Sequence, residues 1–225
     1  MKRLIYATIL LCISLGSWAL VPKTVELKKE TAEMDLQIKY PQGYADKSID
    51  TAVLAFIDAL QKADTPKNQE KLPSDVPGKN SLYINYQTKF QNKQALSLLF
   101  SISSYSRGAA HPANQVKSLN FLNGLVVNLD QLFKPNSDYL AKIAKWSRES
   151  MMKKKISDVD WVTKGTQPNA ENYKNWFFTK NGLAIVFDTY QVAAYVYGPQ
   201  TVEIPKNELN KVLRPEIVNA VWGKQ

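Results

Sequence analysis

Residues 176–205, WFFTKNGLAIVFDTYQVAAYVYGPQTVEIP, decide the fold. Two apolar runs flank Lys180-Asn181-Gly182, and Asn-Gly between runs of β-forming residues is a strong hairpin signal because tight primed turns need positive φ. We therefore expect a buried hairpin here. An aromatic segment should follow it as far as Gly198-Pro199, and a short strand is expected at 201–204.

Strands are also expected upstream of this hairpin. Alternation of apolar and polar residues with period two predicts half-buried strands at 31–40, 81–90 and 95–105. A second Asn-Gly pair, Asn123-Gly124, predicts a further hairpin between 115–122 and 125–129. Most of the expected strands thus follow one another through short connections.

Two long helices are indicated by apolar residues at three- and four-residue spacing, at 46–62 and 137–152. We expect Ser137 to be the N-cap of the second helix. Lys153-Lys154-Lys155 suits its C-terminus, where cations meet the negative end of the helix dipole. Shorter helical segments are expected after Pro205 and at the end of the chain.

This order of elements is typical of an α+β fold. We expect an antiparallel meandering sheet with packed helices, arranged as two small lobes. The N-terminal α+β lobe would span residues 20–92 and the C-terminal α+β module residues 93–225.

Residues 1–19 have the features of a signal peptide: the basic pair Lys2-Arg3, an apolar region at 4–15, and Ser17-Trp18-Ala19 as a small-x-small cleavage signal. An uncleaved anchor is the alternative, but it would need about 20 apolar residues. Cys12 is the single cysteine and lacks the small preceding residue of a lipoprotein site. We expect export to the periplasm or the medium, without disulfides.

The chain is basic, with 29 Lys and Arg against 20 Asp and Glu and a formal net charge of +9. Removing Lys2 and Arg3 with the leader leaves +7. This charge favours anionic surfaces such as acidic envelope glycans or lipid headgroups. No nucleic-acid recognition motif is visible, so nucleic acid is not an expected partner. A surface that simply resists aggregation is the alternative interpretation.

Four motifs, in order, resemble a bacterial envelope family of unknown function: Gly108-Ala109-Ala110-His111, 129–133 (LDQLF), 178–183 (FTKNGL) and 202–205 (VEIP). The chain is similar to the extracellular, lysozyme-binding region of the anti-sigma-V factor and to the non-catalytic module that accompanies a peptidoglycan deacetylase domain. The resemblance covers nearly all of the mature chain and implies the same fold. One departure is Gly108-Ala109, where the family usually has two glycines.

His111 is the only histidine and lies in a loop with Arg107, Gly108 and Pro112. Loops carry function, so Arg107, Gly108 and His111 are candidate binding residues, although His111 also suits a structural role. No second histidine or cysteine accompanies it in the mature chain. We therefore expect neither a metal site of the usual zinc type nor a cofactor, and we assign no catalytic residue.

Aromatic and acidic residues offer further candidates. Tyr190, which we include in the candidate binding set, could stack on sugar rings together with Tyr195, Tyr197 and Trp176; the alternative is that these rings fill the core. Glycan hydrolysis needs two carboxyl groups across the bond. Asp158 and Asp160 could form half of such a pair, for which the sequence shows no partner; the alternative is that they are solvent-exposed residues of a polar connector.

We expect an exported, non-enzymatic binding module of the cell envelope. The family resemblance implies a lysozyme-like protein as partner, and the charge favours an anionic cell-wall glycan because lysozymes are themselves basic. Once the leader is removed, stable membrane insertion is not expected. Two alternatives remain: a peptidoglycan-acting hydrolase that uses His111 as a general base, and a structural envelope protein without a small ligand.

Overall fold

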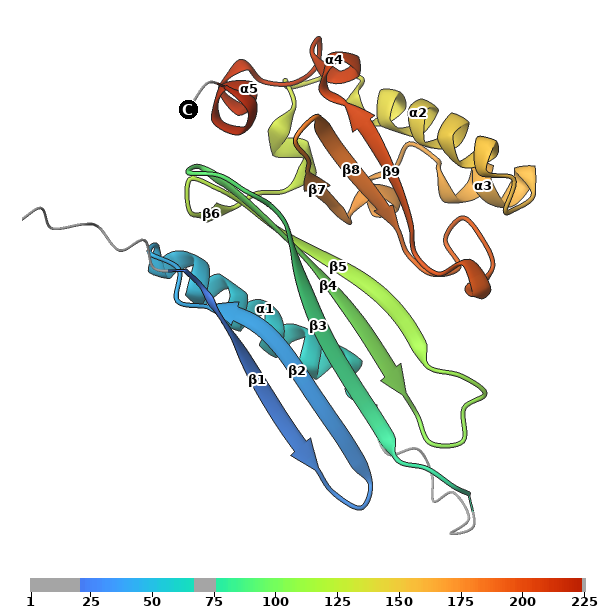
Figure 1. Ribbon diagram of the computed structural model, residues 1–225. Coiled ribbons are helices and arrows are strands. Elements are labelled where there is room, and N and C mark those ends of the chain that lie inside the picture. The colour runs from blue at the N-terminus through green and yellow to red at the C-terminus, as the bar shows by residue number, and fades with distance from the viewer. Residues whose placement is uncertain (1–20, 67–75, 224–225) are drawn as a thin grey trace, which may run out of the picture.

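The computed structural model describes residues 21–66 and 76–223. It contains a six-stranded sheet, in the order β1-β2-β3-β4-β5-β6, and a three-stranded sheet, in the order β7-β8-β9 (Figure 1). The predicted signal peptide at 1–19, including Cys12, lies outside the described residues. Within the described ranges, no helix combines the length and the apolarity needed to cross a membrane.

One helix covers one face of the large sheet. The strands are β1 (Lys23–Glu30), β2 (Met34–Gln42), β3 (Asn80–Gln91), β4 (Ala95–Tyr105), β5 (Ala113–Leu122) and β6 (Leu125–Val126), and the helix is α1 (Lys47–Asp64). Asp46 caps α1 by accepting a hydrogen bond from the backbone N–H of Ser48. Val53 and Ile57 of α1 pack on apolar side chains from alternate strand positions, including Ile38, Leu82, Ile84, Leu98, Phe100 and Ile102.

The α+β class is confirmed, with one parallel pair in the sheet. β2 and β3 run parallel and are joined by α1, because parallel neighbours need a long crossover connection. All other neighbouring strands pair antiparallel. The edge strand β1 was not predicted: it is highly charged and mostly exposed, so it carries little apolar periodicity.

The three-stranded sheet is buried on both faces along two of its strands, whereas the third strand exposes Thr201 and Glu203. It consists of β7 (Trp176–Phe178), β8 (Gly182–Phe187) and β9 (Gln200–Pro205), and every residue of β8 is buried. One face packs on a core shared with α2 (Tyr139–Lys154), α3 (Val159–Gly165), α4 (Lys206–Leu209) and α5 (Pro215–Trp222). The other face turns Phe177, Ala184 and Val186 towards Val116 of the large sheet. This double burial explains the continuous apolar run in β8.

The two Asn-Gly pairs adopt different turns. Asn123 (φ 50°) and Gly124 (φ 78°) form the predicted primed turn between β5 and β6. The β7–β8 hairpin is confirmed, but Asn181 and Gly182 do not have positive φ, so the predicted turn type is wrong. Gly182 is needed for space instead, because a Cβ there would lie 2.0 Å from the carbonyl oxygen of Ile204.

The helix ends show one success and one error. The basic run does end α2, with Lys155 as a left-handed C-cap at φ 54°. Asp138, not Ser137, occupies the N-cap position, and its side chain makes no capping hydrogen bond. The segment after α2, which holds Asp158 and Asp160, contains α3 and is followed by the 3₁₀ turn Ala170–Tyr173; two further 3₁₀ turns are Leu129–Leu132 and Tyr195–Tyr197.

The predicted lobe boundary after residue 92 falls in the turn between β3 and β4, which pair from Ser81–Tyr105 to Gln91–Leu96. The core beneath α1 draws its buried residues from Leu36 to Phe121. The second core, apart from Ala95, draws its buried residues from Val127 to Val221. A division into two lobes stays a prediction, and the packing favours a boundary near the β5–β6 turn.

Candidate functional site

The face of the large sheet opposite α1 carries polar side chains, and strand β7 lies across one end of it. β7 pairs with β8 alone, so one edge of its backbone faces the large sheet. Phe178 N–H donates to Ser97 Oγ at 3.0 Å, and Trp176 N–H donates to Ser118 Oγ at 3.0 Å. Trp176 O accepts a hydrogen bond from Asn120 Nδ2 at 2.8 Å. We call Ser97, Ser118 and Asn120 the covered half of this face.

The small sheet in turn caps the free edge of β5. Val116 N–H donates to Asp188 Oδ1 at 3.0 Å, and Ser118 N–H donates to Asn175 Oδ1 at 3.3 Å. Burial raises the pKa of Asp188, while the backbone N–H groups of Thr189 and Val116 act in the opposite direction. The two sheets are therefore held together by side chains of each that bind the backbone of the other, which satisfies buried polar groups on both.

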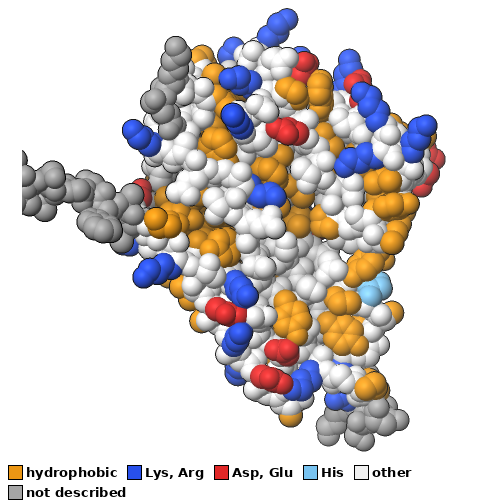
Figure 2. Space-filling view, in the orientation of Figure 1, with side chains coloured by type: hydrophobic (Ala, Val, Ile, Leu, Met, Phe, Trp, Pro, Cys, Tyr) orange, Lys and Arg blue, Asp and Glu red, His pale blue; other side chains and the backbone are white. Residues whose placement is uncertain are grey.

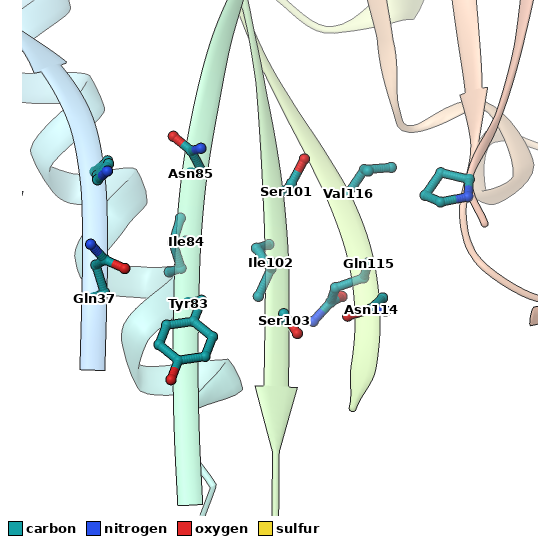
Figure 3. A pocket seen from close by; sticks show the side chains of 12 residues that line it. Gln37, Tyr83, Ile84, Asn85, Ser101, Ile102, Ser103, Asn114, Gln115 and Val116 are labelled. Atoms are coloured by element: carbon teal, nitrogen blue, oxygen red, sulfur yellow. The ribbon is translucent and has the colours of Figure 1, made fainter. Parts of the chain in front are cut away.

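The rest of this polar face is open and hollowed. We call its side chains the open half: Gln37, Tyr83, Asn85, Ser101, Ser103 and Asn114, which line a groove of about 410 Å³ (Figure 3). Their strand register sets them side by side, since Tyr83 pairs with Ser103, Ser103 with Asn114, and Asn85 with Ser101. Pro199, from the loop between β8 and β9, also lines the groove.

Most of the groove lining is neutral. The Tyr83 hydroxyl donates to Asp35 Oδ2, and this hydrogen bond raises the pKa of Tyr83, so its phenol stays protonated at neutral pH. Lys39 is the one cation among the described lining residues, and its Nζ lies 3.6 Å from Glu26 Oε1. Hydrogen bonds from Gln37 and then Lys28 hold the pKa of Glu26 below its usual range.

Two predicted site residues meet beside this groove. The rings of His111, Tyr190 and Tyr195 form what we call the aromatic cluster, with centroid separations of 4.3 Å (His111–Tyr195), 5.5 Å (Tyr190–Tyr195) and 6.5 Å (His111–Tyr190). The Tyr195 hydroxyl accepts a hydrogen bond from Asn114 Nδ2 at 2.7 Å and donates to Pro112 O at 3.0 Å. Because Asn114 also lines the groove, the cluster adjoins it. In Figure 2 the histidine, in pale blue, lies at the surface beside exposed hydrophobic side chains.

The other two predicted residues lie in the turn before His111. Gly108 adopts φ 87°, which favours glycine, and Ala109 N–H donates to Ser106 O. Arg107 N–H donates to Asn80 Oδ1 at 2.8 Å, which ties the turn to the start of β3. Arg107 and Gly108 therefore belong to a turn that supports the loop containing His111.

The described surroundings of His111 are aromatic rings and one backbone carbonyl. Its Nδ1 lies 2.9 Å from Pro112 O, a carbonyl that can only accept, so Nδ1 is the donor. In residues 21–66 and 76–223, its ring contacts are with tyrosines, no carboxylate hydrogen bonds to it, and no group of three or more His, Cys, Asp or Glu could hold a metal ion. Asp158 is the N-cap of α3 and accepts from Trp161 N–H.

The aromatic candidates divide between surface and core. Trp176 is only 2% exposed and fills the core, whereas Tyr190 and Tyr197 are about half exposed. The open half was missed as a site, although its residues occupy the polar positions of strands that the sequence predicted. Only the register between strands, which sequence alternation does not give, brings these side chains together.

Comparisons with known proteins agree with this architecture. Residues 130–207 match the model of a family described as a protein of unknown function, DUF3298. The chain is 25% identical over 191 residues to the peptidoglycan-N-acetylmuramic acid deacetylase PdaC of Bacillus subtilis strain 168. That match covers 83% of this chain and spans 40% of the length of the relative.

Two solved structures share the fold. A DUF3298 family protein from Pseudomonas aeruginosa PAO1 superposes with a TM-score of 0.65 at 15% identity, covering 88% of this chain and 96% of that one. A family member from Bacteroides fragilis NCTC 9343 gives a TM-score of 0.61 at 16% identity, covering 92% and 98%. The resemblance to an envelope domain family of unknown function is confirmed, since residues 130–207 match the DUF3298 model and two DUF3298 family structures share the fold.

Proposed function

We propose that this protein is a non-enzymatic binding module of the bacterial cell envelope, and that the open half of its sheet face holds a cell-wall glycan whose rings carry acetamido groups. The envelope setting is supported by the similarity to a relative named for its action on peptidoglycan. The ligand class is argued from the side chains of the face itself.

The main support for this proposal is the covered half, because its serine and asparagine side chains bind backbone amide groups. Ser97, Ser118 and Asn120 hold the N–H and C=O groups of secondary amides, which here belong to β7. An acetamido substituent on a sugar is also a secondary amide, with one donor and one acceptor. The open half presents similar hydroxyl and amide side chains: Ser101, Ser103 and Asn114 lie further along β4 and β5, beyond Leu99 and Val116, and Gln37, Tyr83 and Asn85 come from β2 and β3. Among the described residues no strand lies on them.

Size and charge support the same ligand. The volume of about 410 Å³ falls within the range of about 300–1,000 Å³ that is usual for ligand pockets. Tyr83, 40% exposed, offers a ring face to a sugar. Lys39 and the overall charge of +9 favour an anionic wall polymer over a basic protein such as a lysozyme.

The test is calorimetric titration of the purified protein with two neutral hexasaccharides that differ at one substituent. Chitohexaose carries an acetamido group on every ring, and cellohexaose carries a hydroxyl in its place. We expect saturable binding to chitohexaose and at least about tenfold weaker binding to cellohexaose, which corresponds to about 1.4 kcal/mol. Equal affinities, or no binding to either sugar, would contradict the proposed ligand.

Two parallel assays separate the alternatives. Sedimentation with purified peptidoglycan should show saturable binding, and no soluble fragments should appear in the supernatant; their release would overturn the non-enzymatic assignment. Binding to lysozyme that survives about 0.5 M salt, where charges are screened within a few ångströms, in the absence of glycan binding would favour a protein partner instead.

A further inference from the structure

We infer that the aromatic cluster of His111, Tyr190 and Tyr195 is a stacking subsite for a pyranose ring at one end of the bound glycan. This inference rests on the proposed function, because it extends the same ligand beyond the groove. It assigns Tyr190 as the contact residue, and His111 and Tyr195 as its neighbours that complete the surface.

The position of the cluster supports a continuous binding surface. Asn114 lines the groove and donates to the hydroxyl of Tyr195, so a ligand that reaches Asn114 lies next to these rings. His111 is exposed and Tyr190 is 50% exposed. The C–H groups on one face of a pyranose are apolar, and they pack on an aromatic face whose hydroxyl edge remains in water.

The backbone of Tyr190 is the second observation. Its φ of 67° lies in the left-handed region, which is strained for a residue with a Cβ and suits Gly or Asn better. The surrounding loop fixes this conformation. Trp161 Nε1 donates to Tyr190 O at 2.9 Å, Gln191 N–H donates to Asp188 O at 3.0 Å, and Val192 is fully buried.

A tyrosine is therefore held at a strained position where its ring is half exposed. Burial of the ring does not compensate for the strain, since half of the side chain is in solvent. Strained backbone positions occur preferentially at ligand-contacting sites, where the surrounding structure holds them in place. Tyr195 differs, because its hydroxyl bonds both Asn114 and Pro112 and so has a structural role as well.

The test compares Tyr190→Asn with Tyr197→Asn by chitohexaose titration and thermal unfolding. Tyr197 is matched in exposure, at 48%, and follows Tyr195 by two residues outside the cluster. We expect Tyr190→Asn to lower the affinity about fivefold, the loss of one aromatic stacking contact, with an unchanged or higher Tm because Asn tolerates positive φ. Tyr197→Asn should leave the affinity unchanged, and Tyr190→Phe, which restores the ring, should recover it.

The outcomes are distinguishable. If the wild-type protein does not bind chitohexaose, the proposed function fails and this inference fails with it. If the wild-type protein binds and Tyr190→Asn binds equally well, only the stacking subsite is overturned. A lower Tm together with weaker binding in Tyr190→Asn would assign Tyr190 a structural role and would also contradict the inference.

Discussion

The two halves of the polar sheet face have the same chemistry and different partners. Ser97 is fully buried, and its hydroxyl accepts a hydrogen bond from the backbone of β7. Ser101 lies four residues further along the same strand, on the same face, and is exposed in the groove. The comparison teaches that the serines and asparagines of both halves can bind amide groups. The small sheet occupies these side chains over only part of the face.

The largest expected difference is in stability, and it compares Asn120→Ala with Asn85→Ala. Asn120 is buried and donates to Trp176 O, so its truncation leaves a buried carbonyl without its donor and creates a small cavity. We expect a loss of about 3 kcal/mol in the free energy of unfolding for Asn120→Ala, measured by urea denaturation. The exposed Asn85 should change it by less than about 0.5 kcal/mol. Equal losses in the two variants would contradict the division of the face.

For glycan affinity we expect the larger effect from residues of the open half. Asn85→Leu combined with Ser101→Val removes two polar side chains from the groove and keeps their approximate size. We expect about tenfold weaker binding to chitohexaose, since each net hydrogen bond contributes about 0.5–1.5 kcal/mol. The free energy of unfolding serves as the control and should stay within about 0.5 kcal/mol of the wild type. If this double variant binds chitohexaose as tightly as the wild type, the open half is not the glycan-binding site.

A pH series tests the contact between the small sheet and the edge of β5. Burial raises the pKa of Asp188 in the folded protein, so between the usual aspartate pKa and this higher value the folded state binds more protons than the unfolded state. The contribution of Asp188 to stability therefore falls as the pH rises through this window. Asp188→Asn keeps an oxygen acceptor for Val116 N–H without the charge.

We accordingly expect Asp188→Asn to gain stability relative to the wild type between pH 3 and pH 7, as measured by urea denaturation at a series of pH values. The difference should be smallest at the acidic end, where both side chains are neutral. A stability difference that does not change with pH would show that the carboxyl group is not the titrating group at this contact.

The smallest effect is expected from the single cation of the groove lining. Lys39→Ala should weaken sedimentation with peptidoglycan about two- to fivefold at low salt, because Lys39 lies beside Glu26 and its exposed charge contributes at most about 1 kcal/mol. The effect should disappear near 0.5 M salt. Lys93→Ala, which removes the same charge from the exposed turn between β3 and β4, is the matched control. Equal weakening by both variants would indicate attraction to the whole basic surface.

Much of the fold was predictable where local physics decides it. The alternation in β2, β3 and β4 and the apolar stripe of α1 gave these elements within a few residues, because one face of each packs on a core. The edge strand β1 lacked such a stripe, and the parallel pairing of β2 with β3 depends on the path of α1. The Asn181-Gly182 turn was misjudged because Gly182 is fixed by the approach of Ile204, a residue 22 positions away.

The candidate site was less predictable than the fold. His111 and Tyr190 were chosen separately, from a loop and from an aromatic segment, and only tertiary structure shows that their rings lie in one cluster. The groove needed the register of four strands, β2 to β5, and its polar residues look like ordinary solvent-facing positions in sequence. No local pattern separates Ser97 from Ser101, because the small sheet that covers one and leaves the other open lies about 80 residues further along the chain.

The most direct test of the central claim is a ¹H–¹⁵N NMR titration of the purified protein with chitohexaose. The side-chain amide signals of Gln37, Asn85 and Asn114, which line the groove, should shift progressively and saturate with the calorimetric affinity. The side-chain amide of Asn120, which is buried and bound to Trp176 O, should not shift. Shifts confined to residues remote from the open half, or no shifts at saturating sugar, would contradict the account.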